Sequence, residues 1–145
     1  MNRIIRCLAG TVVAAGLLFA SAAPAMEIRQ FDKMAVEDQK EYVGELVAGA
    51  QKVLTDSGHA DQAEQVGTLF TTKPRDSDIS IGMSQLVANL ALVRVTDLKR
   101  LEADPDAVRL HVEHAMIMTL KHVGIVLPKS FMHVMDGFKP KQPLH

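Results

Sequence analysis

The sequence predicts an all-α protein: a small four-helix-type bundle with an additional short C-terminal helix, preceded by a cleavable signal peptide. Apolar residues recur at intervals of three and four along most of the chain, whereas the alternation typical of strands is not sustained anywhere. No internal repeat and no change of composition divides the chain. We therefore expect a signal peptide at 1–25, a single helical domain at 26–138 and a flexible tail at 139–145.

The first 25 residues have the three parts of a secretory signal peptide. Two arginines lie within a short basic head, an apolar run covers 7–22, and Ala-Pro-Ala at 23–25 forms a cleavage site. A membrane-spanning helix needs about 20 apolar residues, so this run is short for an anchor. Cys7 lies at the start of the run rather than after it, which disfavours a lipoprotein. The sequence predicts cleavage after Ala25 and a periplasmic or secreted protein without a stable membrane anchor.

Removal of this leader changes the charge and the cysteine content. The chain has 16 basic and 17 acidic residues, and the leader holds two of the basic ones, Arg3 and Arg6, so the mature net charge is about −3. This sign argues against nucleic-acid binding, which is typical of a basic face. The single cysteine, Cys7, also leaves with the leader, which excludes disulfides, thiolate nucleophiles, cysteine-ligated zinc and iron–sulfur clusters from the mature chain. Burial of apolar residues therefore has to stabilise the fold, and no cofactor is expected.

Three helices are expected before residue 104 from the spacing of the apolar residues. They cover 35–57, 60–70 and about 80–103. Gly58 ends the first, and the turn-rich segment 71–78 separates the second from the third.

Asp104-Pro105 predicts the start of a fourth helix, because aspartate caps helices and proline suits their first position. This helix is expected to reach Val123. A last short helix is expected to open at Pro128. The methionine-rich apolar end of the chain, 125–138, has two interpretations: a lid that completes the core, which we favour, or an adaptable surface for a partner.

Four charged residues lie within the apolar faces of the third and fourth helices: Arg94, Asp97, Arg109 and Glu113. The favoured interpretation is a structural ion pair that sets helix register, or long side chains at the edge of the bundle. The alternative is a ligand-binding pocket, in which Glu113 acts as an acid or base and Arg94 holds an anion.

Three histidines, His111, His114 and His122, lie within about 80° of one another on the fourth helix, on a face expected to be exposed. We favour an ordinary solvated face. The alternative is a transition-metal site, because neutral imidazoles one turn apart bind such ions. Thioethers and a further imidazole suited to copper lie nearby in the sequence at Met118, Met132, His133 and Met135.

The sequence lacks a Gly-x-Ser-x-Gly elbow, a glycine-rich phosphate loop and a His-Glu-x-x-His motif. Gly67 and Gly82 lie inside predicted helices, where they favour close helix packing. Our favoured hypothesis is an exported, non-enzymatic helical protein, with no catalytic residues, that acts by protein interaction or by chaperone-like binding under envelope stress. The alternative is a periplasmic protein that binds a small ligand or Cu, Ni or Zn. The sequence leaves the partner and the oligomeric state open.

Overall fold

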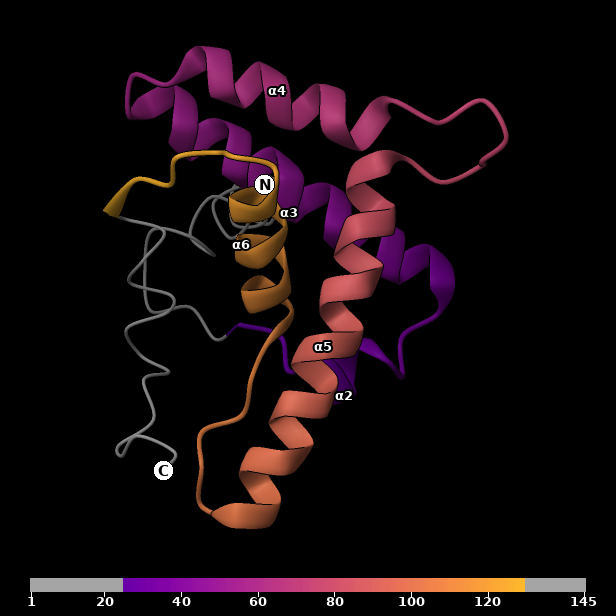
Figure 1. The fold of residues 1–145 in the computed structure, drawn as a ribbon, viewed down its shortest axis with the longest axis vertical. Helices are drawn as coiled ribbons and strands as arrows, with labels where there is room; N and C mark the ends of the chain where they lie inside the picture. The colour runs from indigo at the N-terminus through magenta and orange to yellow at the C-terminus, as the bar shows by residue number, and fades with distance from the viewer. Residues whose placement is uncertain (1–24, 130–145) are drawn as a thin grey trace, which may run out of the picture.

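A computed structural model describes residues 25–129, and this part of the chain is mostly helical (Figure 1). It has five helices: α2 (Ile28–Phe31), α3 (Val36–Asp56), α4 (Ala60–Thr71), α5 (Ile81–Ala103) and α6 (Val112–His122). No strand forms within 25–129; Glu27 and His111 make an isolated antiparallel bridge. The signal peptide predicted at 1–25, the short helix expected after Pro128 and the tail at 139–145 lie outside the described residues, apart from Ala25 and Lys129 at the two limits.

Three of the expected helices are confirmed within about one residue at each end: α3, α4 and α5. α3 and α4 form a hairpin at the top of Figure 1, and α5 runs steeply away from it. Gly58 makes the hairpin turn with a φ of 83°, a left-handed conformation that glycine adopts without strain. Ser80 caps α5, since its hydroxyl accepts the Met83 N–H at 3.2 Å. Local sequence signals therefore placed these boundaries correctly.

The helix α6 lies in the interior, beside α5 and antiparallel to it (Figure 1). Most of its side chains are buried, polar ones included, so it lacks the broad wet face that was expected of the fourth helix. It packs on apolar residues from the other helices, among them Leu46, Leu54, Val66, Leu86 and Leu90. The buried residues of α6 are Val112, Glu113, His114, Ala115, Met116, Ile117, Thr119 and Leu120.

The fourth helix also begins later than predicted, at Val112 rather than at Asp104-Pro105. Asp104 does not start the fourth helix but ends α5 as its C-cap residue, and its Oδ1 accepts the backbone N–H of Asp106 at 3.1 Å in a local turn. The chain then runs back beside α5 in a non-helical conformation (Figure 1). Asp97 of α5 holds this segment, because its Oδ1 accepts the Leu110 N–H at 2.8 Å. A tertiary hydrogen bond therefore outweighs the local helix-start signal.

None of the described helices is long and apolar enough to span a bilayer.

The helices α4 and α5 approach each other closely at Gly82. A Cβ atom at Gly82 would lie 2.9 Å from two ring carbons of Phe70, which is closer than side chains tolerate. At Gly67 the close neighbour is instead the side-chain amide of Gln51, at 2.6 Å. The expected role of Gly82 in helix packing is thereby confirmed.

The substitution Gly82→Ala is expected to lower the free energy of unfolding by about 1–3 kcal/mol, because the added methyl group overpacks the contact with Phe70. The matched control is Gly44→Ala on α3, where a Cβ meets nothing within 4 Å. The control should raise the free energy of unfolding by about 0.5–1 kcal/mol, since alanine favours helix. Urea denaturation followed by circular dichroism measures both, and equal effects of the two changes would contradict the close contact.

Candidate functional site

The four charged residues predicted to share a pocket lie in three different environments. Arg94 pairs with Asp32, just after α2, through two hydrogen bonds of 3.0 and 2.7 Å from its Nε and Nη2. Both side chains are about 40% exposed, so this pair joins two elements at the surface. The hydrogen bonds that Arg94 donates to Asp32 raise the pKa of its guanidinium. Arg94 therefore does not face Glu113, and the predicted anion site is not assembled around it.

Asp97 and Arg109 do lie together, where the non-helical segment 104–111 meets α5. Arg109 Nη1 lies 3.4 Å from Asp97 Oδ2, and its Nε lies 3.9 Å from Glu27 Oε2. Asp97 is buried, and its other oxygen is used by the Leu110 N–H. The Asp97 carboxylate joins α5 to the segment 104–111, because both groups that it binds, the Arg109 guanidinium and the Leu110 N–H, belong to that segment.

Glu113 is fully buried, and its partner is a tyrosine. The Tyr42 hydroxyl of α3 donates a hydrogen bond to Glu113 Oε1. Burial raises the pKa of Glu113, and the hydrogen bond from Tyr42 opposes that shift. Burial, together with the adjacent carboxylate, raises the pKa of the Tyr42 hydroxyl in turn. Because Glu113 has no exposed surface, it cannot meet a substrate in this conformation.

The histidines do not form one exposed stripe. His114 is 4% exposed, His111 is half-buried and His122 is exposed. The rings of His111 and His114 stack with centroids 6.1 Å apart. His122 follows His114 by eight residues, about 12 Å along the helix axis, so those two cannot share an ion. The expectation of a wet histidine face is therefore wrong for His114.

The backbone gives His114 a structural role at the start of α6. Its Nδ1 accepts the N–H of His111, the residue that precedes the helix, at 3.1 Å. Burial is the main cause that lowers the pKa of His114 to about 4, and the neighbouring His111 adds to it by charge repulsion. Burial also lowers the pKa of His111, against the attraction of Glu27 and Asp97. Both imidazoles are thus favoured in the neutral form.

No group of three or more histidine, cysteine, aspartate or glutamate side chains within 25–129 is placed to hold a metal ion. Met118 lies on α6, whereas Met132, His133 and Met135 fall outside the described residues.

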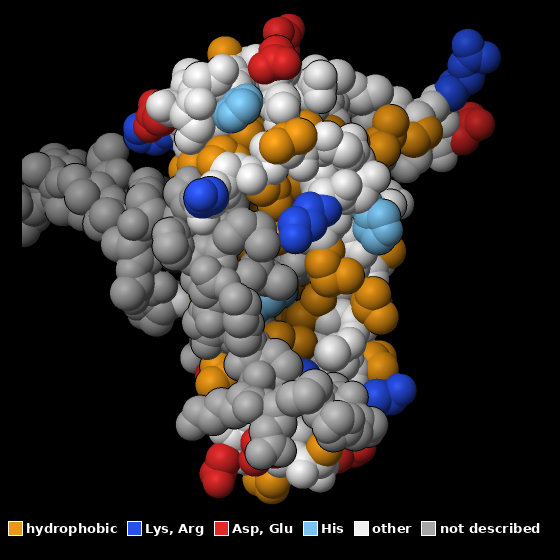
Figure 2. All heavy atoms as spheres, turned by 60° about the vertical axis from the view of Figure 1, so that its left-hand side comes forward, with side chains coloured by type: hydrophobic (Ala, Val, Ile, Leu, Met, Phe, Trp, Pro, Cys, Tyr) orange, Lys and Arg blue, Asp and Glu red, His pale blue; other side chains and the backbone are white. Residues whose placement is uncertain are grey.

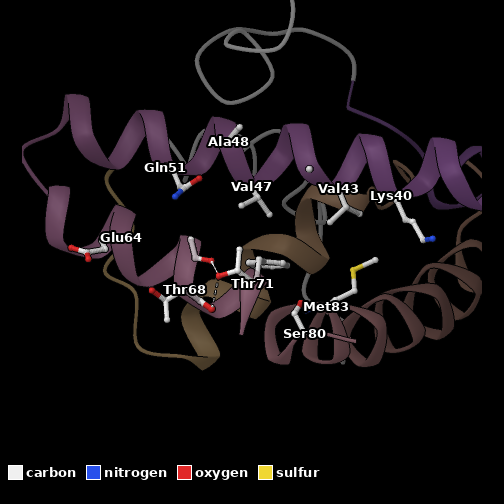
Figure 3. A pocket seen from close by; sticks show the side chains of 13 residues that line it. Lys40, Val43, Val47, Ala48, Gln51, Glu64, Thr68, Thr71, Ser80 and Met83 are labelled. Carbon is white, nitrogen blue, oxygen red and sulfur yellow. Dashed lines mark hydrogen bonds between the residues drawn. The ribbon is translucent and has the colours of Figure 1, made fainter. Parts of the chain in front are cut away.

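A groove of about 670 Å³ lies between α3 and α4, closed at one end by the start of α5 (Figure 3). We call it the α3/α4 groove. Its apolar floor comes from Val43, Val47, Phe70 and Met83. Lys40 and Glu64 lie at its opposite ends. The remaining lining residues are small or uncharged: Gly44, Ala48, Gln51, Gly67, Thr68, Thr71 and Ser80.

Small residues one helical turn apart open this groove. Gly44 and Ala48 lie on the α3 side, and a Cβ at Gly44 would meet nothing within 4 Å. The side chain of Gln51 is held by a 3.0 Å hydrogen bond to the Ala63 carbonyl, so it forms a fixed part of the wall. A second groove of about 580 Å³ lies on the other side of α4, between that helix and Ile125. Of the two, only the α3/α4 groove combines a mainly apolar floor with one charge of each sign at its ends.

Sequence reasoning missed both the α3/α4 groove and two buried polar contacts. Tyr42 is the only tyrosine of the chain and lies beside the apolar stripe of α3, which was an available signal. Asn89 lies between the inward-facing Leu86 and Leu90, and its Nδ2 donates to Thr119 Oγ1 of α6 at 2.9 Å. A polar residue within an apolar stripe signals such a partner, although periodicity does not identify the partner.

Comparison of the chain with protein-family models, with curated proteins and with solved structures finds no match.

The free energy of unfolding is expected to fall on acidification from about pH 6.5 to pH 4, and His114→Asn should remove much of that dependence. The pKa of His114 is about 4 in the folded chain, below the ordinary value of 6.5, so the unfolded chain binds more protons in this range. The lost stability is at most about 3 kcal/mol. Asparagine keeps an acceptor near the position of Nδ1 but does not titrate.

Chemical denaturation at several pH values measures this difference, with His122→Asn on the exposed part of α6 as the control. If the free energy of unfolding varies with pH in the same way for the wild type and for His114→Asn, the lowered pKa of His114 is contradicted.

Proposed function

We propose that this chain is an exported, non-enzymatic helical protein that binds apolar segments of other proteins, in the manner of a chaperone under envelope stress. In this proposal the leader at 1–25 is removed during export, and the protein works in the periplasm or outside the cell. Its working form is a four-helix-type bundle of α3, α4, α5 and α6, which the chain after Pro128 extends by a short helix.

The observation that carries the proposal is the α3/α4 groove. An apolar side chain entering it leaves water for the floor formed by Val43, Val47 and Phe70, which is favourable by about 25 cal/mol per Å² of apolar surface buried. Met83 adds an unbranched thioether that fits side chains of different shapes. These features support binding of varied apolar segments rather than of one rigid partner.

The charges at the two ends add a preference for orientation. Glu64 favours a basic residue at its end of the groove, whereas Lys40 at the other end already pairs with Glu37 at 2.9 Å and attracts an acidic residue only weakly (Figure 3). Both side chains are exposed, so their effect on affinity is modest and falls with salt. The expected client segment is therefore apolar in the middle, with charge tolerated at its ends.

The substitution Gly44→Leu is expected to weaken client binding about tenfold, or by about 1.4 kcal/mol. Leucine favours helix over glycine and has room at this position, so it fills the groove without disturbing α3. The matched control is Glu45→Leu, an exposed neighbour that does not line the groove. Light scattering of reduced, aggregating α-lactalbumin measures the effect as the concentration of chain needed for half-suppression.

We expect the wild type and Glu45→Leu to suppress aggregation equally. Absence of suppression by the wild type, or full suppression by Gly44→Leu, would contradict the proposal.

A small-ligand or transition-metal protein remains the second candidate. A groove of about 670 Å³ is within the range of about 300–1,000 Å³ that small-molecule sites occupy, which supports a ligand. For a metal, the supporting contact is the stacked pair His111 and His114. An ion bound there would require His114 to leave its buried position, because its Nδ1 already accepts the His111 N–H.

If the histidines bind a metal, calorimetric titration with Cu²⁺, Ni²⁺ or Zn²⁺ gives saturable heat that disappears in the double variant His111→Ala and His114→Ala. Circular dichroism confirms that the double variant is folded, and His122→Ala serves as the control for unspecific binding by a surface histidine. A titration without saturable heat would remove this candidate.

A further inference from the structure

The outward face of α5 is apolar along most of its length. α6 packs on one side of this helix and α4 crosses its N-terminal end (Figure 1). Figure 2 shows hydrophobic side chains reaching the surface in the middle of the molecule and at its right-hand margin, whereas acidic side chains lie toward its upper and lower ends. Half of the exposed large hydrophobic residues of the described chain belong to α5: Ile81, Val87, Leu92, Val95 and Leu98, each 45–57% exposed.

The centre of this face follows a heptad spacing. Positions 84, 88, 91, 95, 98 and 102 are separated alternately by four and three residues, and all six are exposed. The side chains at these positions are Ser84, Ala88, Ala91, Val95, Leu98 and Glu102. Such a stripe is typical of a helix that packs along a second helix, yet no described helix covers it.

The side chains of the stripe change in size along the helix. The first half carries small ones, at Ser84, Ala88 and Ala91, and the second half carries larger ones, at Val95 and Leu98. Facing helices pack best when large side chains meet small ones. A second helix with the same gradient in the opposite direction fits this face, and the chain itself supplies such a helix.

We propose that α5 pairs with α5 of a second copy of this chain, antiparallel about a two-fold axis near Ala91. In this register Ala88 of one copy faces Val95 of the other, and Ser84 faces Leu98. A parallel pair would instead place Leu98 against Leu98 and leave the alanines of both copies facing each other. The antiparallel arrangement therefore fills the interface evenly along α5.

The charges on the face favour the same direction. Lys99 and Glu102 are the charged residues of the exposed apolar sector, and both lie near the C-terminal end of α5. Antiparallel pairing places Glu102 beside the N-terminus of the other copy's α5, where the helix dipole favours a negative charge. Lys99 lies over the uncharged first turns of that helix. Parallel pairing would bring the two Glu102 side chains close to each other.

The size of the face indicates a reversible dimer. A helix of 23 residues is about 35 Å long, and one helix pair buries less than the roughly 800 Å² per partner of a standard interface. We expect dissociation in the micromolar range. The proposal goes beyond the proposed function and does not depend on it, because none of the stripe residues Ser84, Ala88, Ala91, Val95, Leu98 and Glu102 lines the α3/α4 groove.

Analytical ultracentrifugation of the chain as purified tests the pairing. The wild type should sediment as a monomer–dimer equilibrium, and Ala91→Glu should weaken the dimer at least tenfold, because it places two carboxylates together at the axis. The matched control is Ala60→Glu at the exposed start of α4, which should leave the equilibrium unchanged. A wild type that stays monomeric at 100 μM, or an unaffected Ala91→Glu dimer, would overturn the proposal.

Disulfide cross-linking in a Cys7→Ser background tests the direction. An equal mixture of Ser84→Cys and Leu98→Cys chains should form a mixed disulfide dimer, whereas Leu98→Cys alone should not cross-link, since antiparallel pairing separates the two copies of that residue by about 20 Å. Cross-linking of Leu98→Cys with itself would overturn the antiparallel register.

The two proposals fail separately. A monomer that still suppresses aggregation overturns the dimer and keeps the client-binding function, whereas a dimer without suppression does the reverse.

Discussion

The burial of polar side chains on α6 is the constraint on which the rest of the fold depends. This helix lies in the core, yet it carries Glu113, His114 and Thr119 into the interior. A buried polar group without a hydrogen bond costs about 1–3 kcal/mol, so partners must come from the surrounding elements. α3 supplies Tyr42 for Glu113, α5 supplies Asn89 for Thr119, and the His111 backbone supplies an N–H for His114. The first two contacts fix α6 against α3 and α5, and the third holds the first turn of α6 itself.

The same constraint explains the non-helical segment before α6. A helix that continued from Asp104 would not bring Val112 to the Met26 carbonyl, which accepts its N–H at 3.0 Å. Asp97 holds the returning chain at Leu110 and Arg109, so the carboxylate that the sequence singled out is used to position α6. With α6 filling the interior, α3 and α4 pack mainly on each other, and their apolar side chains, among them Leu46, Leu54 and Val66, join α6 in one core. Their outer surfaces remain available, and the small residues there leave the α3/α4 groove open.

The sequence predicted the outer helices well and the central one poorly, for a physical reason. α3 and α4 each have one buried and one wet face, so their periodicity reports burial directly. α5 is clearly periodic only on its core side, and its outward stripe of small and apolar residues was not recognised as a surface. α6 is buried nearly all round, so the sequence placed Glu113 correctly on an apolar side but assigned His114 to a wet face that this helix lacks. An ion pair between Asp97 and Arg109 could be expected from their opposite charges and their positions in the sequence. The pairing of Tyr42 with Glu113 could not, because it depends on how α3 is placed in the fold.

Native-state hydrogen exchange resolved along the chain tests the central position of α6 most directly. The account predicts that the amides of Met116 to Leu120 are the slowest to exchange among residues 25–129, and that they exchange only through global unfolding, with a free energy equal to that of urea denaturation. Amides in the middle of α4 should open at lower free energy, since that helix has an exposed side. Exchange of the α6 amides at a free energy below that of α4 would contradict the account, because a helix that opens first cannot be the element on which the others pack.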